Sequence, residues 1–332
     1  MTVGVEEELM LLDARTLDLA PRAREVIDAL GGDSRFTLEL PAAQVEIVLP
    51  PMTGAAEVGP ALLAARRDLA EACGPLGLRP AAAGVHAFAA PLGELNAGER
   101  YDRILGEFGD VARAQLVFAL QVHVAVRPAD RAMDVYNALR PWLPLVAALA
   151  ANAPLHDGRD TGLASVRPTI SERLPRQGMP PPLTWERYAG ELAALPDPAQ
   201  WWWELRPHPR FGTLEVRVPD AQATVEEAVA VVAVVHALVA WLAEGERPAP
   251  ADDPETGRAL ALCHGAAPPF RAALHDLLDA LEPVAQRLGA SPQLATAGRM
   301  VEAGGGAARQ RAAFAQGGAR HAVADLAERF LA

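Results

Sequence analysis

The sequence of 332 residues contains no lysine, and all 30 of its basic residues are arginines. A P-loop nucleotide-binding protein needs a lysine at the phosphates, and a Schiff-base enzyme needs a lysine amine. Both classes are therefore excluded, and with them a large share of ATP and aldol chemistry.

Cysteine is also scarce. Cys73 and Cys263 are the only two, and they lie far apart without a CxxC spacing, so the sequence suggests neither a zinc knuckle nor a disulfide framework. The segment Met1–Leu12 carries three glutamates and no basic residue, which is wrong for a signal peptide. We therefore expect the protein in a reducing cytoplasm.

Long apolar runs are equally rare. The longest, Ala228–Ala243, is interrupted by His236 and is shorter than the ~20 residues that span a bilayer, so we interpret it as a buried helix. The net charge of -12 gives nucleic acid and anionic membranes no electrostatic reason to bind. We expect small-molecule partners with metal ions and, because homo-oligomers are common, association of identical chains.

Hydrophobic residues make up 51% of the chain, enough to bury a large core. Four helices are expected in this core, at Pro21–Leu30, Ala55–Gly74, Asp130–Ala151 and Thr224–Gly245. Thr224 and Glu227 have the spacing of a capping box. The proline-rich stretch Pro248–Pro254 is the best candidate for a boundary, and the chain after it has helical periodicity. We predict a catalytic core at residues 1–247 with a helical part at 248–332 packed on it, or a single domain of both.

Five segments are expected to be strands with one apolar and one polar face. Side chains alternate between the faces of a strand, so residues two apart share a surface. The expected strands are Thr2–Leu12, Gln44–Leu49, Leu116–Val126, Trp202–Arg206 and Thr213–Val218. Their polar faces carry the pairs Glu6 and Glu8, Gln44 and Glu46, Gln121 and His123, Glu204 and Arg206, and Glu215 and Arg217. Glu7 is an exception, because it falls on the apolar side of its strand.

Acidic residues dominate these polar faces. Two carboxylates at positions i and i+2 lie ~6.6 Å apart along a strand, and at an effective dielectric constant of ~20 each such pair repels by roughly 2.5 kcal/mol. One polar strand face is explained by solvent on one side of an antiparallel sheet. Here several strands carry acidic residues on their polar faces, which weakens that explanation. A concave surface that gathers Glu6, Glu8, Glu46 and Glu215 needs protons or cations, and oxygen ligands favour Mg²⁺ or Mn²⁺ over zinc.

Six segments, spread in order over nearly the whole chain, carry a specific pattern. They are TVGVEEELMLLD (Thr2–Asp13), QVEIVLP (Gln44–Pro50), AAAGVHAF (Ala81–Phe88), LQVHVAV (Leu120–Val126), ALAANAPLHDGRDTGLASVRP (Ala148–Pro168) and WWWELRPHPRFGTLEVRVPDAQ (Trp201–Gln222). Together they resemble the YbdK-type carboxylate-amine ligases, relatives of glutamate-cysteine ligase. The resemblance implies an α+β fold with a curved, mainly antiparallel sheet of glutamine-synthetase type, helices on its outer face and a helical C-terminal part.

The resemblance also implies an activity. ATP phosphorylates the γ-carboxylate of glutamate or a similar acid, and an amine such as cysteine displaces phosphate from the acyl phosphate, with weak glutamate-cysteine ligase activity. The implied cofactors are ATP and Mg²⁺ or Mn²⁺. The implied metal ligands are Glu6, Glu8, Glu39, Glu46, Gln121 and Glu215. The implied catalytic residues are Arg167, Arg206 and Arg217, and the groups that hold nucleotide or substrate are His123, Arg159, Ser165 and Arg210.

The chain departs from the family pattern in three ways. Gln121 stands where the family usually has the first histidine of HVHVG, although an amide oxygen can still bind Mg²⁺. Glu204 replaces an aspartate, and the segment between Tyr188 and Trp201 is shorter than usual. Two other hypotheses stay open: a metal-dependent hydrolase that uses the same acids, and a catalytically inactive relative that binds nucleotide or amino acid.

Overall fold

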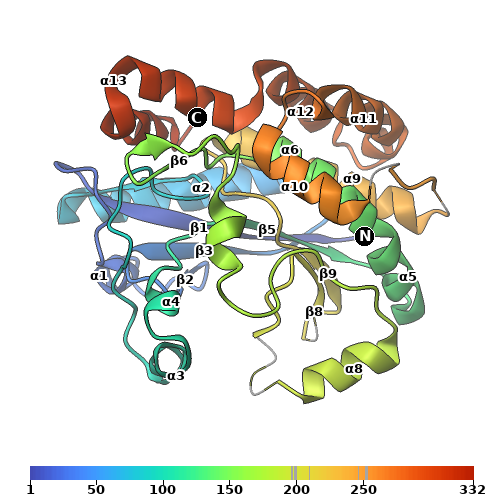
Figure 1. Ribbon diagram of the computed structural model, residues 1–332, viewed down its shortest axis with the longest axis horizontal. Helices are drawn as coiled ribbons and strands as arrows, with labels where there is room; N and C mark the ends of the chain where they lie inside the picture. The colour runs from blue at the N-terminus through green and yellow to red at the C-terminus, as the bar shows by residue number, and fades with distance from the viewer. Residues whose placement is uncertain (196, 198–199, 209, 246, 251–252) are drawn as a thin grey trace.

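A seven-stranded sheet with antiparallel pairing throughout forms the middle of the molecule (Figure 1). The computed structural model describes residues 1–195, 197, 200–208, 210–245, 247–250 and 253–332. The strands follow the order β2-β3-β1-β5-β9-β8, and β4 pairs with the second half of β1. Their bounds are β1 Val3–Asp13, β2 Phe36–Leu38, β3 Gln44–Met52, β4 Leu78–Ala81, β5 Leu120–Ala125, β8 Leu205–His208 and β9 Thr213–Val216. The α+β fold with a mainly antiparallel sheet is thereby confirmed.

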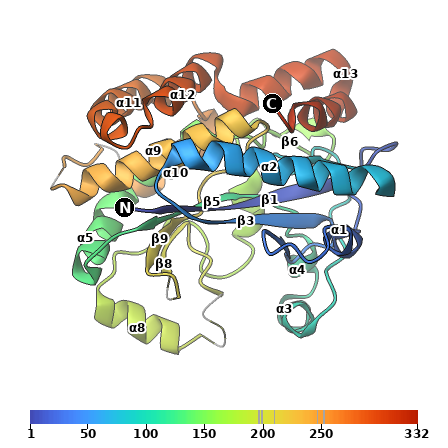
Figure 2. The same ribbon diagram turned by 180° about the vertical axis from the view of Figure 1, so that it is seen from behind.

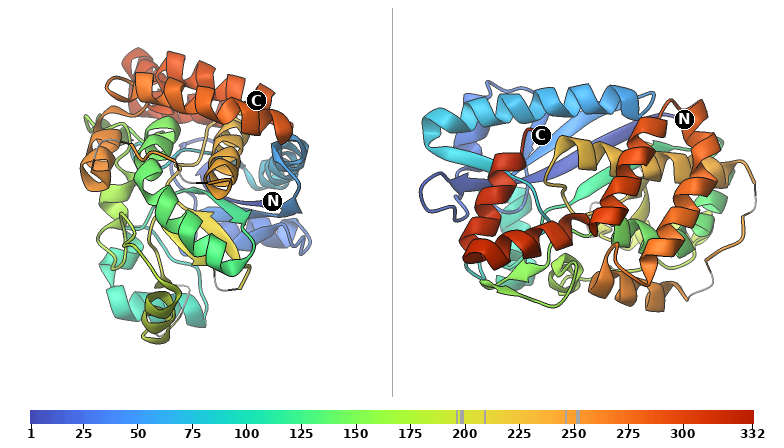
Figure 3. Two further views of the ribbon diagram at one scale, coloured as in Figure 1. Left: turned by 90° about the vertical axis from the view of Figure 1, so that its right-hand side faces the viewer. Right: turned by 90° about the horizontal axis from the view of Figure 1, so that it is seen from above.

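One face of the sheet is covered by helices. The helices α2 (Ala55–Cys73) and α9 (Val225–Ala243) lie directly on it, and α11 (Phe270–Arg287) and α12 (Ser291–Ala303) pack on α9 (Figures 1 and 2). Viewed from above, the C-terminal helices, including α13 (Gly305–Arg329), spread over this layer (Figure 3). The apolar sides of the strands face these helices, which leaves the polar sides for the opposite face.

Two further helices, α6 Leu143–Ala150 and α10 Pro254–His264, belong to the helical layer, because α6 packs on α9 and α11, and α10 packs on α6. The remaining helices flank the sheet or lie in the connections on its polar side. They are α1 Ala23–Ala29, α3 Glu99–Phe108, α4 Asp110–Arg113, α5 Ala129–Leu139, α7 Arg167–Ser171 and α8 Trp185–Ala193. A short hairpin of β6 (Leu155–His156) and β7 (Arg159–Asp160) adds a second, two-stranded sheet. In Figure 1, α3, α4 and α8 lie below the main sheet, on the side away from α9.

The longest apolar run forms the central helix α9. Among the described residues it is the one helix long and apolar enough to cross a membrane, but 83% of its apolar window is buried inside the protein. Thr224 caps it by accepting a hydrogen bond from the backbone N–H of Glu227 at 3.1 Å. The Glu227 side chain pairs with Arg309 of α13, so only half of the expected capping box forms. The expectation of a buried helix is confirmed.

Several predicted boundaries were wrong. The single helix expected at Asp130–Ala151 is interrupted between α5 and α6, where Pro141 and Pro144 remove backbone donors. The strand expected at Trp202–Arg206 begins at Leu205, and Glu204 lies before it. The short strands β2 and β4 were missed, since three or four residues show no clear alternation.

The C-terminal part is helical from α10 onward, as the periodicity predicted. Residues 251 and 252 of the predicted boundary Pro248–Pro254 lie outside the described residues, as do 196, 198 and 199 of the segment before Trp201. The division into residues 1–247 and 248–332 stays a prediction.

Candidate active site

Strand register lines up the polar side chains in a row across the sheet. Backbone pairing sets each of these residues opposite another on the neighbouring strand. The pairs are Glu46 with Glu8, Glu6 with Gln121, His123 with Glu215, and Glu215 with Arg206. Directly opposed side chains on one face lie ~4.5–5.5 Å apart at Cβ. Segments distant in sequence therefore bring their functional groups to one surface.

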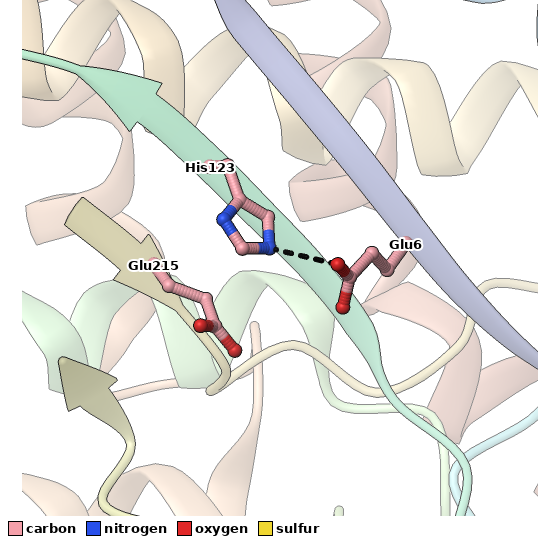
Figure 4. A group of neighbouring side chains, drawn as sticks. All are labelled: Glu6, His123 and Glu215. Carbon is pink, nitrogen blue, oxygen red and sulfur yellow. Dashed lines mark ion pairs between the residues drawn. The ribbon is translucent and has the colours of Figure 1, made fainter. Parts of the chain in front are cut away.

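Glu6, His123 and Glu215 form a compact group with the donors of a cation site (Figure 4). Each offers one ligand atom, and these atoms lie within 4.8 Å of one another. His123 Nε2 is 3.3 Å from a Glu6 carboxylate oxygen and is buried without a hydrogen bond, whereas Nδ1 lies 3.1 Å from the Thr213 hydroxyl. A ring whose second nitrogen is held by a neighbour is the usual arrangement of a metal-bound histidine. The residues present fit a divalent cation.

A second acidic group consists of Glu8, Glu39 and Glu46. Burial raises the pKa of Glu46 well above its usual range, and the charges of Glu39, Glu6 and Glu8 add to the shift. Burial, followed by the charge of Glu39, raises the pKa of Glu8 to about 7. Burial also raises the pKa of Glu39. These carboxyl groups cannot all carry charge together unless cations or protons compensate them.

Two arginines hold Glu215 from the other side. Arg206 Nε donates to Glu215 Oε2 at 2.5 Å, and Arg217 donates to Oε1. Burial alone would raise the pKa of Glu215, but the charges of Arg217 and Arg206 outweigh burial and lower it to about 2. Glu215 is therefore ionised at neutral pH. A cation bound beside it would contact carboxylate oxygens that already accept hydrogen bonds from Arg206 and Arg217.

Gln121 has a different place from the one expected. Its amide nitrogen donates to Glu8 Oε1 at 2.9 Å, and its amide oxygen accepts from Arg217. Its side chain thus bridges an acid and an arginine, and its part as a metal ligand stays a prediction. The nitrogen atom that lies near Glu6 and Glu215 belongs to His123. The reason is register, because His123 is the β5 residue directly opposite Glu215.

Arg167 and Ser165 both reach a carboxylate that the sequence reasoning missed. Arg167 Nε and the Ser165 hydroxyl donate to Asp220 Oδ1 at 2.6 and 3.1 Å, and the Asn152 backbone N–H donates to Oδ2 at 2.7 Å. Arg167 NH2 donates to the Val218 carbonyl at 2.5 Å. Ser165 is consequently a buried partner of Asp220, whereas Arg167 still lines the cavity described next.

A cavity joins the acids to a wall of arginines. Glu8 and Glu39 lie in its lining together with Arg100, Arg167 and Arg217. The α10 helix adds Arg258, which donates to Glu204 at 2.7 Å. The remaining walls include the apolar side chains Ile104, Val117, Leu174 and Trp202. Such a cavity suits a ligand with carboxylate or phosphate groups next to metal-bound oxygens.

Arg159 and Arg210 lie on connections away from the acidic groups. Arg159 is on the β6–β7 hairpin, where its side chain is 76% exposed and its guanidinium is 3.9 Å from Asp157. Arg210 is exposed in the connection between β8 and β9, beside Phe211. Neither position brings a side chain to the acids in the structure as it stands.

A buried ion pair lies directly behind the site. Glu7, on the apolar side of β1, pairs with Arg66 of α2, and both side chains are fully buried. The sequence contained a signal for this pair, because a charge on an apolar face requires a partner. Its identity could not be read, since Arg66 is 59 residues away in the chain.

Comparison with known proteins agrees with this architecture. Residues 2–324 match the family described as Glutamate-cysteine ligase family 2. A Rubrobacter xylanophilus protein provisionally named glutamate–cysteine ligase 2-3 is 35% identical, covering 98% of this chain and 96% of its own. A Mycolicibacterium smegmatis relative of the same provisional name is 34% identical, covering 100% and 97%.

Among solved structures, the chain is similar to the Francisella tularensis glutamate–cysteine ligase in complex with AMP, with a TM-score of 0.75 at 12% identity, covering 99% of this chain and 88% of that one. A bifunctional glutathione synthetase from Pasteurella multocida has a TM-score of 0.74 at 14% identity, covering 99% and 52%. At these identities the likeness shows the fold. The family match and the relatives together show that the chain belongs to glutamate–cysteine ligase family 2, a family of carboxylate-amine ligases.

Proposed function

We propose that the protein is an ATP-dependent ligase that joins the γ-carboxylate of glutamate, or of a similar acid, to an amine such as cysteine. The observation that carries the proposal is the row of acids from β1, β3 and β9 on one face of the sheet, together with a cavity lined by Glu8, Glu39 and arginines. Nucleotide use is supported by the Francisella tularensis relative, whose structure contains AMP. ATP would phosphorylate the carboxylate, and the amine would then displace phosphate as the amide bond forms.

Two cation positions are proposed. Glu6, His123 and Glu215 would hold one ion, and the group of Glu8, Glu39 and Glu46 would hold another. When bound, Mg²⁺ or Mn²⁺ would neutralise phosphate and carboxylate oxygens and align them for transfer. When no cation is bound, the raised pKa values of Glu8 and Glu46 favour the protonated forms of these carboxyl groups.

The arginines are proposed to bind and orient the anionic groups. Arg217 contacts both Glu215 and Gln121, so its guanidinium is already fixed at the junction of the two acidic groups. Arg167 is anchored through Nε and NH2, and its NH1 has no hydrogen-bond partner among the residues described. An arginine held on two edges presents the third to a carboxylate or phosphate with little further loss of conformational freedom. No covalent nucleophile is needed.

The wider setting is proposed from the same features. We infer that the enzyme works in the cytoplasm as a homo-oligomer on an amino acid and an amine, without nucleic-acid or membrane partners. The net charge of -12 and the burial of α9 support this setting. Light scattering after size-exclusion chromatography measures the number of chains, and a monomer would contradict the homo-oligomer.

The test is an ATP-consumption screen with Mg²⁺, glutamate fixed and a panel of amines varied. The expected result is release of ADP and phosphate together with an amide product identified by mass. Binding of ATP without turnover for any acid and amine would identify an inactive relative instead. Metal-dependent hydrolysis without ATP would identify a hydrolase.

A further inference from the structure

The connection between β8 and β9 carries an exposed aromatic ring. Phe211 is 54% exposed, yet its ring lies parallel to that of His208, with a centroid distance of 4.2 Å and an interplanar angle of 9°. His208 Nδ1 accepts the backbone N–H groups of Arg210 at 3.3 Å and Phe211 at 3.2 Å. The histidine that underlies the ring therefore also holds the turn that carries it. His208 covers one face of Phe211, and about half of the Phe211 surface stays exposed.

This stack lies beside the cation group. The Phe211 centroid is 5.9 Å from that of His123, and the His208 centroid is 5.5 Å from it. The His123 ring nitrogen is in turn within 4.8 Å of ligand oxygens of Glu6 and Glu215. An exposed aromatic ring is thus only one side chain away from the atoms proposed to hold a cation.

We infer that the Phe211 ring, supported by His208, is the platform on which the base of the nucleotide stacks. The inference rests on the proposed function. A nucleotide whose terminal phosphates reach the cations has to place its base near them, and Phe211 is an exposed ring beside that group. The cavity lining carries charged groups such as Arg100, Arg167 and Glu39, which suit phosphate and carboxylate, beside its apolar walls.

The platform has a defined chemical preference. Stacking on an aromatic side chain tolerates any base, because every base has a π-face. The Arg210 guanidinium carbon is 5.8 Å from the centroid of the same ring and adds a positive charge at the rim. Phe211 would therefore add affinity for nucleotides in general, and a choice between bases would have to come from other groups.

Calorimetric titration of the full chain with two probes tests the platform. ATP and inorganic tripolyphosphate, each with Mg²⁺, present similar phosphates, but only ATP carries a base. Phe211→Ala is expected to raise the Kd for ATP roughly 10-fold or more and to leave the Kd for tripolyphosphate unchanged. Phe211→Trp keeps a ring at this position and should retain the affinity for ATP.

The matched control is Trp185→Ala on α8, which removes another partly exposed aromatic ring, 36% exposed, outside the lining of the cavity. It should leave both Kd values at those of the wild-type protein. An unchanged Kd for ATP in Phe211→Ala would overturn the platform, and so would an equal weakening of tripolyphosphate, which would mean that the ring shapes the cation site.

Failure of the ligase proposal would look different. A wild-type protein that binds ATP more weakly after Phe211→Ala, but consumes it with no acid and amine, would leave the platform in place and refute the ligase. A wild-type protein that ligates, with no effect of Phe211→Ala on the Kd for ATP, would refute the platform alone. A wild-type protein that binds no ATP would refute both.

Discussion

Breaking the buried ion pair behind the site should destabilise the whole fold. Glu7 and Arg66 are fully buried, with Arg66 Nε and NH2 donating to the carboxylate at 2.9 and 2.5 Å. The guanidinium also donates to the carbonyls of Gln222, Ala223 and Phe330 at 2.8, 3.3 and 2.8 Å. It therefore joins β1, α2, the segment after β9 and the end of α13 through one side chain.

The expected magnitude follows from what each substitution leaves behind. Glu7→Gln keeps the shape but leaves the Arg66 cation buried without a counterion, which costs about 3–5 kcal/mol of unfolding free energy. Arg66→Met leaves a buried carboxylate and three carbonyl groups without their donors, each unsatisfied group adding roughly 1–3 kcal/mol, so it should cost more. The double variant Glu7→Met with Arg66→Met removes both charges and should recover part of the loss.

Urea unfolding followed by circular dichroism measures these differences. The matched control is Glu25→Gln, which makes the same chemical change in an exposed pair. Glu25 lies 2.5 Å from Arg22, but its side chain is 52% exposed. Because water screens such a pair, the control should cost far less unfolding free energy than Glu7→Gln. The reasoning is refuted if Glu7→Gln is no more destabilising than Glu25→Gln, or if the double variant is no more stable than Arg66→Met alone.

The remaining predictions concern the site. Glu8→Gln should abolish ligase turnover while the circular dichroism spectrum stays that of the wild type, because it removes a charged oxygen ligand; full activity would remove Glu8 from the cation site. Burial and the charge of Glu39 raise the pKa of Glu8 in the folded protein to about 7. The protonated carboxyl therefore stabilises the folded protein fully below the pKa of an unfolded glutamate, and this contribution is lost as the pH rises through about 7. In EDTA, thermal unfolding midpoints should therefore fall as the pH rises from about 5 to 8, less so in Glu8→Gln, and a flat wild-type profile would contradict this. At pH 8, added Mg²⁺ should raise the midpoint of the wild type, because a bound cation stabilises the folded state; no shift at millimolar Mg²⁺ would count against the site. Asp220→Asn should raise the KM for the acid substrate more than Ser165→Ala does, because Arg167 loses its charged anchor; equal KM values in steady-state kinetics would show that Asp220 does not position Arg167.

Local patterns predicted much of the fold and of the site. Alternation along β1, β3, β5 and β9 placed Glu6, Glu8, Glu46 and Glu215 on the face opposite the helices. The long helices α2 and α9 followed from their apolar residues and from the Thr224 cap. Where local signals were weak, as in β2 and β4, the prediction failed because a few residues carry no measurable period.

What the sequence determines by itself is which side chains share a face, because a strand has a period of two that needs no knowledge of its neighbours. It also determines that arginine is the side chain available to pair with an anionic group in place of lysine, since no lysine is present. Only the tertiary structure decides which residues meet across strands. Register is set by packing and by distant pairing, and it places His123 opposite Glu215, leaves Gln121 between Glu8 and Arg217, and brings Asp220 to Arg167.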